Sequence, residues 1–263
     1  MMFKDPLIKN LLNYKDLLLV FIWREFTIRY RQSMLGVLWA VLQPLSMMLL
    51  FTFIFGVVLK YKVSNYPHVL FFYSGLLPWT FFSSSINFSI SSLVNHRGLI
   101  TKIYFPKEII PISGIAVSFI DFCIAFFIYL ILMAAYGMHF SLNFLWFFPL
   151  LFILVIFTVS LGLIFAALNV YYRDVKLFSG FLLQLWFFAT PVFYSIDKVS
   201  FKWKLILFLN PLTFIVENMR RVTLENRSIV LWQLGFVLVV IFIFYLLSRT
   251  IFLKIERKMA DVI

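Results

Sequence analysis

The chain has 263 residues, of which 63% are hydrophobic, 21% aromatic and only 13% charged. Soluble domains are about 45–50% apolar and 25% charged, and a chain of this length has too little interior to bury such an excess. These values exclude an ordinary soluble domain, and the net charge of +12, carried between apolar runs, is expected to mark the cytoplasmic face of a membrane rather than a nucleic-acid-binding surface.

The N-terminal segment, residues 1–34, alternates apolar and charged residues. This pattern predicts a cytoplasmic amphipathic helix in the headgroup layer of the membrane. Glu25 and Arg29 are four residues apart, in the order that favours a helical ion pair, and Arg24 and Arg31 share a face. The simpler alternative is that the segment only anchors the first membrane span.

Six regions are apolar over the roughly 20 residues that a membrane-spanning helix needs. These predicted spans cover residues 35–59, 69–94, 109–136, 145–170, 177–196 and 229–252. They predict an all-α integral membrane protein with one transmembrane domain, residues 35–252, followed by a cytoplasmic tail, residues 253–263. An even number of spans places both termini on one side, and the excess of Lys and Arg on that side predicts that it is the cytoplasm.

A seventh apolar region precedes the last span but is interrupted. Residues 201–209 and 212–219 are each too short to cross a membrane, and Asn210-Pro211 separates them. Proline lacks a backbone donor and disfavours helix at the residue before it. We therefore expect residues 197–228 to form an outer re-entrant loop with a helical hairpin; an amphipathic loop on the membrane surface is the alternative.

Asp121 lies near the centre of the third predicted span. A carboxylate there costs roughly 2.5–3.5 kcal/mol on insertion scales, so it is expected to face the bundle interior. No basic residue lies within another predicted span near its depth, which leaves protonation, or hydrogen bonds from Ser, Thr or Tyr hydroxyls. Such a residue would also suit a proton-linked secondary carrier.

Signatures of enzymes are absent from the sequence. There is no glycine-rich phosphate loop ending in Gly-Lys-Ser/Thr, and His68, His96 and His139 have no neighbours at metal-ligand spacing. We therefore expect a transport subunit with no catalytic residue, no metal and no bound cofactor.

Five short patterns occur in order along nearly the whole chain. They are residues 24–39 (REFTIRYRQSMLGVLW) with 42–44 (LQP), 95–108 (NHRGLITKIYFPKE) with Pro111, 171–174 (YYRD), 190–194 (TPVFY) and 210–212 (NPL). Together they resemble the ABC-2 type permeases that export polysaccharide, namely O-antigen, capsule and teichoic-acid exporters.

The resemblance implies a homodimer in the bacterial inner membrane, each copy bound to a cytoplasmic ATP-binding cassette subunit that holds the ATP and Mg. Residues 95–108 would be the cytoplasmic coupling loop that docks on this ATPase. The residues expected to couple are Asn95, His96, Arg97, Gly98, Lys102, Tyr104, Phe105 and Pro106. Gly98 and Pro106 are expected to bracket a short helix; alternatively, the basic residues only satisfy the inside-positive bias.

The cargo implied by the resemblance is a polysaccharide linked to undecaprenyl diphosphate. Arg24, Arg29 and Arg31 lie where a diphosphate in the cytoplasmic leaflet could be met, and arginine binds two phosphate oxygens at once; attraction to anionic membrane lipid is the alternative.

Sugar rings lie well on aromatic faces, so aromatic residues are candidates for the polymer path, although most are expected to face lipid or pack between helices. These candidates are Phe51, Phe53, Phe55, Tyr73, Trp79, Phe81, Phe187 and Phe193. An ABC-2 permease for another lipid or drug is the alternative within the superfamily.

Overall fold

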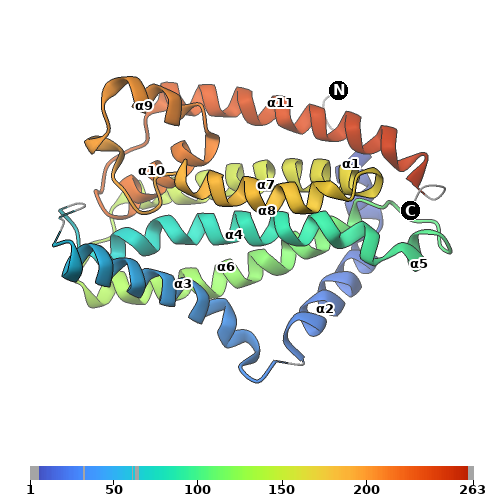
Figure 1. Cartoon of the computed structure of the whole chain (residues 1–263), viewed down its shortest axis with the longest axis horizontal. Coiled ribbons are helices and arrows are strands. Elements are labelled where there is room, and N and C mark those ends of the chain that lie inside the picture. Colours follow the sequence, from blue (N-terminus) through green and yellow to red (C-terminus); the bar gives the residue numbers. More distant parts are fainter. Residues whose placement is uncertain (1–5, 32, 61, 63–64, 260–263) are drawn as a thin grey trace.

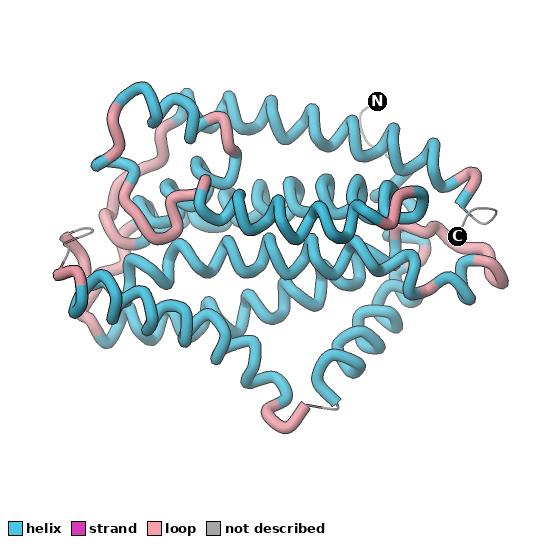
Figure 2. The backbone as a smooth tube through the Cα atoms, in the orientation of Figure 1, coloured by secondary structure: helices cyan, strands magenta, loops and turns pink. Residues whose placement is uncertain are grey.

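The computed structural model describes residues 6–31, 33–60, 62 and 65–259, and over these residues its regular structure is entirely helical (Figures 1 and 2). The α-helices are α1 (Pro6–Asn13), α2 (Lys15–Arg31), α3 (Trp39–Phe51), α4 (His68–Asn95), α5 (Arg97–Ile100), α6 (Ile109–Ala135), α7 (Phe147–Tyr171), α8 (Asp174–Phe188), α9 (Phe201–Phe208), α10 (Pro211–Thr223) and α11 (Leu231–Glu256). Short 3₁₀ helices are η1 (Gly36–Leu38), η3 (Leu142–Trp146) and η4 (Ile196–Lys198), and a π-helix, η2 (Thr52–Val58), continues α3. The predicted all-α class is confirmed.

Five helical stretches within the described residues are long and apolar enough to cross a membrane. They are Gly36–Val58, His68–Asn95, Ile109–Ala135, Leu142–Tyr171 and Leu231–Glu256. The region expected to form the fifth of six spans holds α8, which has 15 residues. At 1.5 Å per residue it is shorter than the roughly 30 Å hydrocarbon core, so the sixth span stays a prediction.

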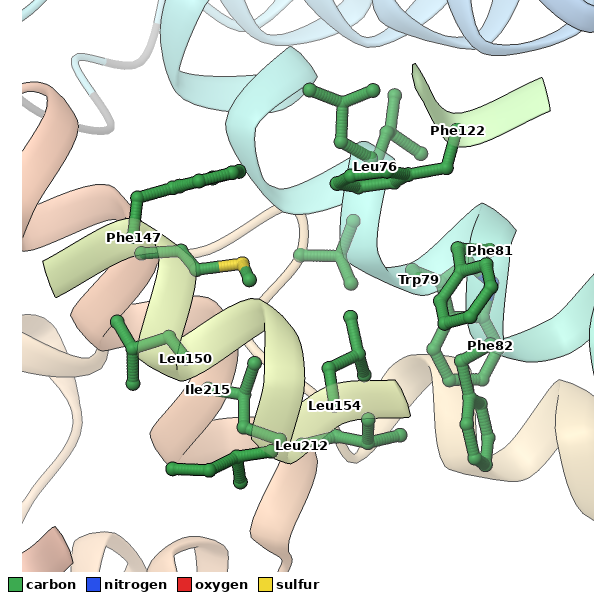
Figure 3. Close-up of a cluster of buried hydrophobic side chains, with 14 of the residues drawn as sticks. Leu76, Trp79, Phe81, Phe82, Phe122, Phe147, Leu150, Leu154, Leu212 and Ile215 are labelled. Atoms are coloured by element: carbon green, nitrogen blue, oxygen red, sulfur yellow. The ribbon is translucent and has the colours of Figure 1, made fainter. Parts of the chain in front are cut away.

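Helix α4 forms the centre of the bundle and packs against α6, α7 and α10. Figure 3 shows side chains from these four helices meeting in one apolar cluster. Phe82 of α4 stacks on Phe157 of α7 with ring centroids 5.8 Å apart. Gly114 lets α6 approach α4 closely, because a Cβ added there would lie 1.8 Å from the Phe88 ring.

Helices α2 and α3 diverge from the bundle and form the two arms of a V in Figure 1. Helix α2 packs along α6, whereas α3 packs against α4 and α6. The last turn of α2 therefore lies near the middle of α6 rather than at its end. Helix α2 thus reaches the middle of α6, which is deeper than a helix lying only on the membrane surface would reach.

The predicted break at Asn210-Pro211 is confirmed as the boundary between α9 and α10. Asn210 caps α10 by accepting a hydrogen bond from Leu212 N at 3.0 Å, and Pro211 occupies the first turn, where its missing N–H costs nothing. Both helices lie at the end of the bundle opposite α1 and α5 (Figure 1). Their depth in the membrane, and hence their re-entrant character, stays a prediction.

A second apolar cluster gathers segments that are far apart in sequence. It joins Leu7 of α1, Phe21 of α2, Ile100 of α5 and Phe252 of α11. Helix α1, the first half of α2 and the end of α11 therefore lie at the same end of the bundle, next to the loop between α4 and α6 (Figure 1).

Candidate functional site

The loop between α4 and α6 presents an exposed tip on a buried base. Tyr104 is 92% exposed, and Lys102 and Ile103 beside it are exposed. Phe105, in contrast, is 4% exposed and packs on Phe21 of α2 with ring centroids 6.0 Å apart. The tip can contact a partner, whereas Phe105 fixes the loop to the bundle.

The short helix of this loop is α5, residues Arg97–Ile100. The expectation that Gly98 and Pro106 bracket it is wrong, because Gly98 lies inside the helix. Asn95, Arg97 and Gly98 are exposed, and Pro106 is half-buried. Arg97 thus lies on the outer surface of the loop.

His96 links the loop to α2. Its Nε2 lies 3.0 Å from Oε1 of Glu25, and its Nδ1 donates to the Ser92 carbonyl at 2.7 Å. The hydrogen bond to Glu25 raises the pKa of His96, which favours the charged imidazolium. The expected Glu25–Arg29 pair is wrong: Glu25 contacts His96, and the Arg29 guanidinium points to another helix.

A second polar contact ties the loop to the last helix. Arg249 of α11 forms a buried ion pair with Glu108, and Glu108 also accepts a hydrogen bond from Asn10 Nδ2 at 3.3 Å. Lys107 N donates to Glu256 Oε1 at 3.1 Å. The loop is therefore held to α2 at one end and to both α1 and α11 at the other.

Asp121 has a cationic partner that the sequence did not reveal. Arg29 Nη1 lies 2.5 Å from Oδ2 of Asp121, and Tyr30 Oη donates to Oδ1 at 2.5 Å. Arg29 also reaches Ser118 Oγ at 3.5 Å and lies over the Phe88 ring. The expected hydroxyl partner is present, but the expectation that no basic residue pairs with Asp121 is wrong.

The three candidate arginines of α2 therefore do not converge on one point. Arg29 is turned toward α6, while Arg24 and Arg31 are exposed. Arg24 lines a small groove with Phe21 and Phe105. Arg29 instead contributes to the wall of a cavity of about 650 Å³ between α2, α3, α4 and α6.

Five of the aromatic candidates form one continuous cluster. Phe51 stacks on Phe187 at 6.2 Å, and Phe193 lies within 6.4 Å of Phe51, Phe55 and Phe187. Trp79 joins through Phe187 at 5.3 Å. The cluster brings together the end of α3, η2, α4, the end of α8 and the segment that follows α8.

The remaining aromatic candidates lie elsewhere. Tyr73 is fully buried, stacks on Tyr129 and donates to the Ala125 carbonyl. Phe81 is 2% exposed and packs on Phe122. Phe53 is 57% exposed on η2. Tyr73 and Phe81 thus pack in the core of the chain, where they have no free surface to offer a polymer.

Arg220 of α10 is the principal polar residue that sequence reasoning missed. It is 2% exposed, and its Nη2 donates to the carbonyls of Pro191 and Val192 at 3.1 and 3.2 Å. Its guanidinium lies 3.8 Å over the Phe71 ring. Gly75 provides the space, since a Cβ there would meet Arg220 Nη2 at 2.7 Å. The sequence signal that could have identified Arg220 is the pair Arg220-Arg221 directly after the apolar stretch 212–219.

Within the described residues, no three His, Cys, Asp or Glu side chains converge on a possible metal site. The fold and these contacts define an integral membrane protein whose polar groups link helices. A family model described as ABC-2 type transporter matches residues 16–224, and the chain belongs to this family.

Curated relatives cover most of the chain. An O-antigen export system permease protein RfbA of Myxococcus xanthus is 35% identical over 223 residues, 84% of this chain and 85% of the relative. A protein of the same name from Klebsiella pneumoniae is 32% identical over 94% of this chain and 95% of its own length. A polysialic acid transport protein KpsM of Escherichia coli is 28% identical over 86% of this chain and 90% of its own length.

Proposed function

We propose that the chain is the permease subunit of an ATP-driven exporter of lipid-linked polysaccharide, of the O-antigen type. The observation that carries the proposal is the similarity to O-antigen export permeases over 94% of the chain. The KpsM relative is named for polysialic acid transport, which supports a polysaccharide cargo over a drug or an ordinary lipid.

In this proposal a separate ATP-binding cassette subunit binds ATP and Mg, and the exposed tip around Tyr104 contacts it. The end of the bundle that carries α1, α5 and the end of α11 then faces the cytoplasm of a bacterial inner membrane, with both termini on that side. The loop's links to α2 and α11, through His96 and Glu108, provide a mechanical route from the ATPase to the membrane helices.

The proposed complex contains two copies of the chain, and the cargo moves on an undecaprenyl diphosphate carrier. Arg24 and Arg31 are exposed on α2 and remain candidates for contact with that diphosphate or with anionic membrane lipid. Phe51, Phe55, Phe187 and Phe193 supply a continuous aromatic surface that a polymer could slide along. The weak, sequence-tolerant contacts of rings suit a moving chain.

A proton-linked carrier loses its main support, because Asp121 has Arg29 and Tyr30 as partners and is not an isolated acid. Collapsing the proton gradient while ATP is maintained separates the two mechanisms. An ATP-driven exporter continues to export under these conditions, whereas a carrier stops.

The proposed function is tested by deleting the gene in its own host and measuring surface polysaccharide. We expect polymer to disappear from the surface and its lipid-linked form to accumulate inside the cell, and the wild-type chain to restore export. Unchanged surface polysaccharide in the deletion strain, in the absence of a second copy of the gene, would contradict the proposal.

Replacing Lys102 and Tyr104 together by alanine is expected to lower co-purification of the ATPase at least about fivefold, because both side chains project from the loop. The matched control is Tyr172→Ala, an exposed tyrosine in the other loop at this end of the bundle, which should leave assembly intact. Equal ATPase recovery from the Lys102/Tyr104 variant and the wild type would exclude these residues from the docking surface.

A further inference from the structure

The cavity of about 650 Å³ between α2, α3, α4 and α6 has a wall of polar side chains on the side formed by α4. Helix α4 contributes Ser84, Asn87, Ser91 and Asn95, which recur at intervals of three or four residues and therefore share one helix face. Asn87 is exposed to the cavity at the middle of a helix whose apolar stretch is 78% buried.

The polar groups of this wall are not used by the protein itself. The serines at 74, 89 and 92 of α4 donate to carbonyls of their own helix, whereas the structure records no hydrogen bond from Ser84, Asn87 or Ser91 to any residue that it describes. Polar groups that face lipid without partners cost several kcal/mol each. The cavity must therefore hold water or a polar ligand.

The charge of the cavity argues against an anion as its ligand. Among the described residues of the lining, Arg29 is the one cationic side chain, and Asp121 in the same lining lies 2.5 Å from it and balances its charge. Apart from the indole of Trp39, the other polar lining groups are hydroxyls and amides, which both donate and accept hydrogen bonds. A neutral, hydroxyl-rich molecule matches this set better than a phosphate does.

The side of the cavity formed by α3 adds an aromatic face. Trp39 is 52% exposed and Gln43 lies one turn further along the same helix. An indole ring offers an apolar surface with a polar edge, and a few placed polar groups then fix the orientation of a ligand. The aromatic side and the polar α4 side of this one cavity together suit a ring with apolar C–H faces and hydroxyl edges.

We propose that this cavity is a saccharide-binding site, in which Asn87, Ser84 and Ser91 hydrogen-bond the hydroxyls of one neutral sugar unit and Trp39 covers its face. The proposal rests on the proposed function and adds to it a place where the cargo's sugar, rather than its diphosphate, is recognised. The Arg29–Asp121 pair forms another part of the cavity lining and holds α2 against α6.

The first test places a photocrosslinking benzoylphenylalanine at position 87 in cells that make radiolabelled polymer. We expect label on the protein in these cells and none in cells that cannot start the polymer. The matched control carries the same residue at position 127, where Phe127 is 64% exposed on another face of α6, and should give no sugar label. Crosslinks at position 87 to phospholipid alone, or to a second copy of the chain, would overturn the proposal.

The second test measures export by Asn87→Leu and by Ser84→Ala/Ser91→Ala. We expect at least about a tenfold loss for the leucine variant and about a threefold loss for the double serine variant, with ATPase co-purification unchanged. Ser83→Ala is the control, since Ser83 donates to its own helix at Thr80 O and does not line the cavity. Normal export by Asn87→Leu in a strain that wild type restores would overturn the site while leaving the proposed function intact.

Discussion

Arg29→Met is expected to destabilise the protein by roughly 2.5–3.5 kcal/mol, the insertion cost of a carboxylate near the middle of a span. The variant leaves Asp121 without its cation, and only Tyr30 continues to donate to it. Because α2 packs along α6 at this point, the loss should also free the end of α2. Thermal unfolding of the detergent-purified protein should show a Tm lower by roughly 10 °C, together with weaker export.

The double variant Arg29→Met/Asp121→Asn separates a lost ion pair from a lost side chain. It has no unpaired charge, and asparagine can still accept from Tyr30, so we expect it to recover at least about half of the lost stability. Arg31→Met is the matched control, because Arg31 is exposed, and it should unfold as wild type does. A double variant less stable than Arg29→Met would show that the pair does not act as described.

The Arg29–Asp121 pair also shows where prediction from the sequence stops. The apolar runs closely predicted the positions of the five long apolar helical stretches, and the Asn210-Pro211 break predicted the boundary between α9 and α10, since both depend on local chemistry. The partner of Asp121 depends on how far α2 enters the bundle. A segment interpreted as a surface helix could not supply a partner at the depth of Asp121.

The loop between α4 and α6 shows the same division between local and long-range information. Its place between two apolar runs could be read from the sequence, and its tip at Tyr104 is exposed. The expected contribution of Phe105 at the surface did not follow, because its burial is set by Phe21, more than 80 positions earlier in the chain. Glu25 and Arg29 were likewise expected to pair with each other, but Glu25 contacts His96 and Arg29 contacts Asp121.

The polar face of α4 was visible in the sequence but was not recognised. Ser84, Asn87 and Ser91 lie at helical spacing in the predicted span 69–94, and Asn95 follows at the same spacing directly after it, which is a detectable pattern. Serines are frequent throughout this span, and the sequence does not show which of them bond to their own helix. Only the structure separates those serines from Ser84 and Ser91, which line the cavity.

Arg220→Leu is expected to prevent normal folding of the end of the bundle that carries α9 and α10. Arg220 donates to Ser74 Oγ at 3.3 Å and to the carbonyls of Pro191 and Val192, and hydrogen bonds to a charged group contribute about 1.5–3 kcal/mol each. Losing them should cost more than about 4 kcal/mol, a large part of the 5–15 kcal/mol typical of a whole domain. Yield of monodisperse protein in size-exclusion chromatography should fall at least about fivefold.

Arg221→Leu provides the control for this variant, because the neighbouring arginine makes an exposed contact to the Ser228 carbonyl and should be nearly silent. Arg220→Lys should be intermediate, since an ammonium cannot span the same carbonyls and also lie flat on the Phe71 ring. Wild-type yield and Tm for Arg220→Leu would contradict the anchoring role.

Because Arg220 fixes α10 to α4 while no residue of α9 is buried, α10 is anchored to the bundle and α9 is held only loosely. Movement at this end of the bundle should therefore be confined to α9, and a disulfide joining α9 to the rest of the chain should impede export more than one joining α10.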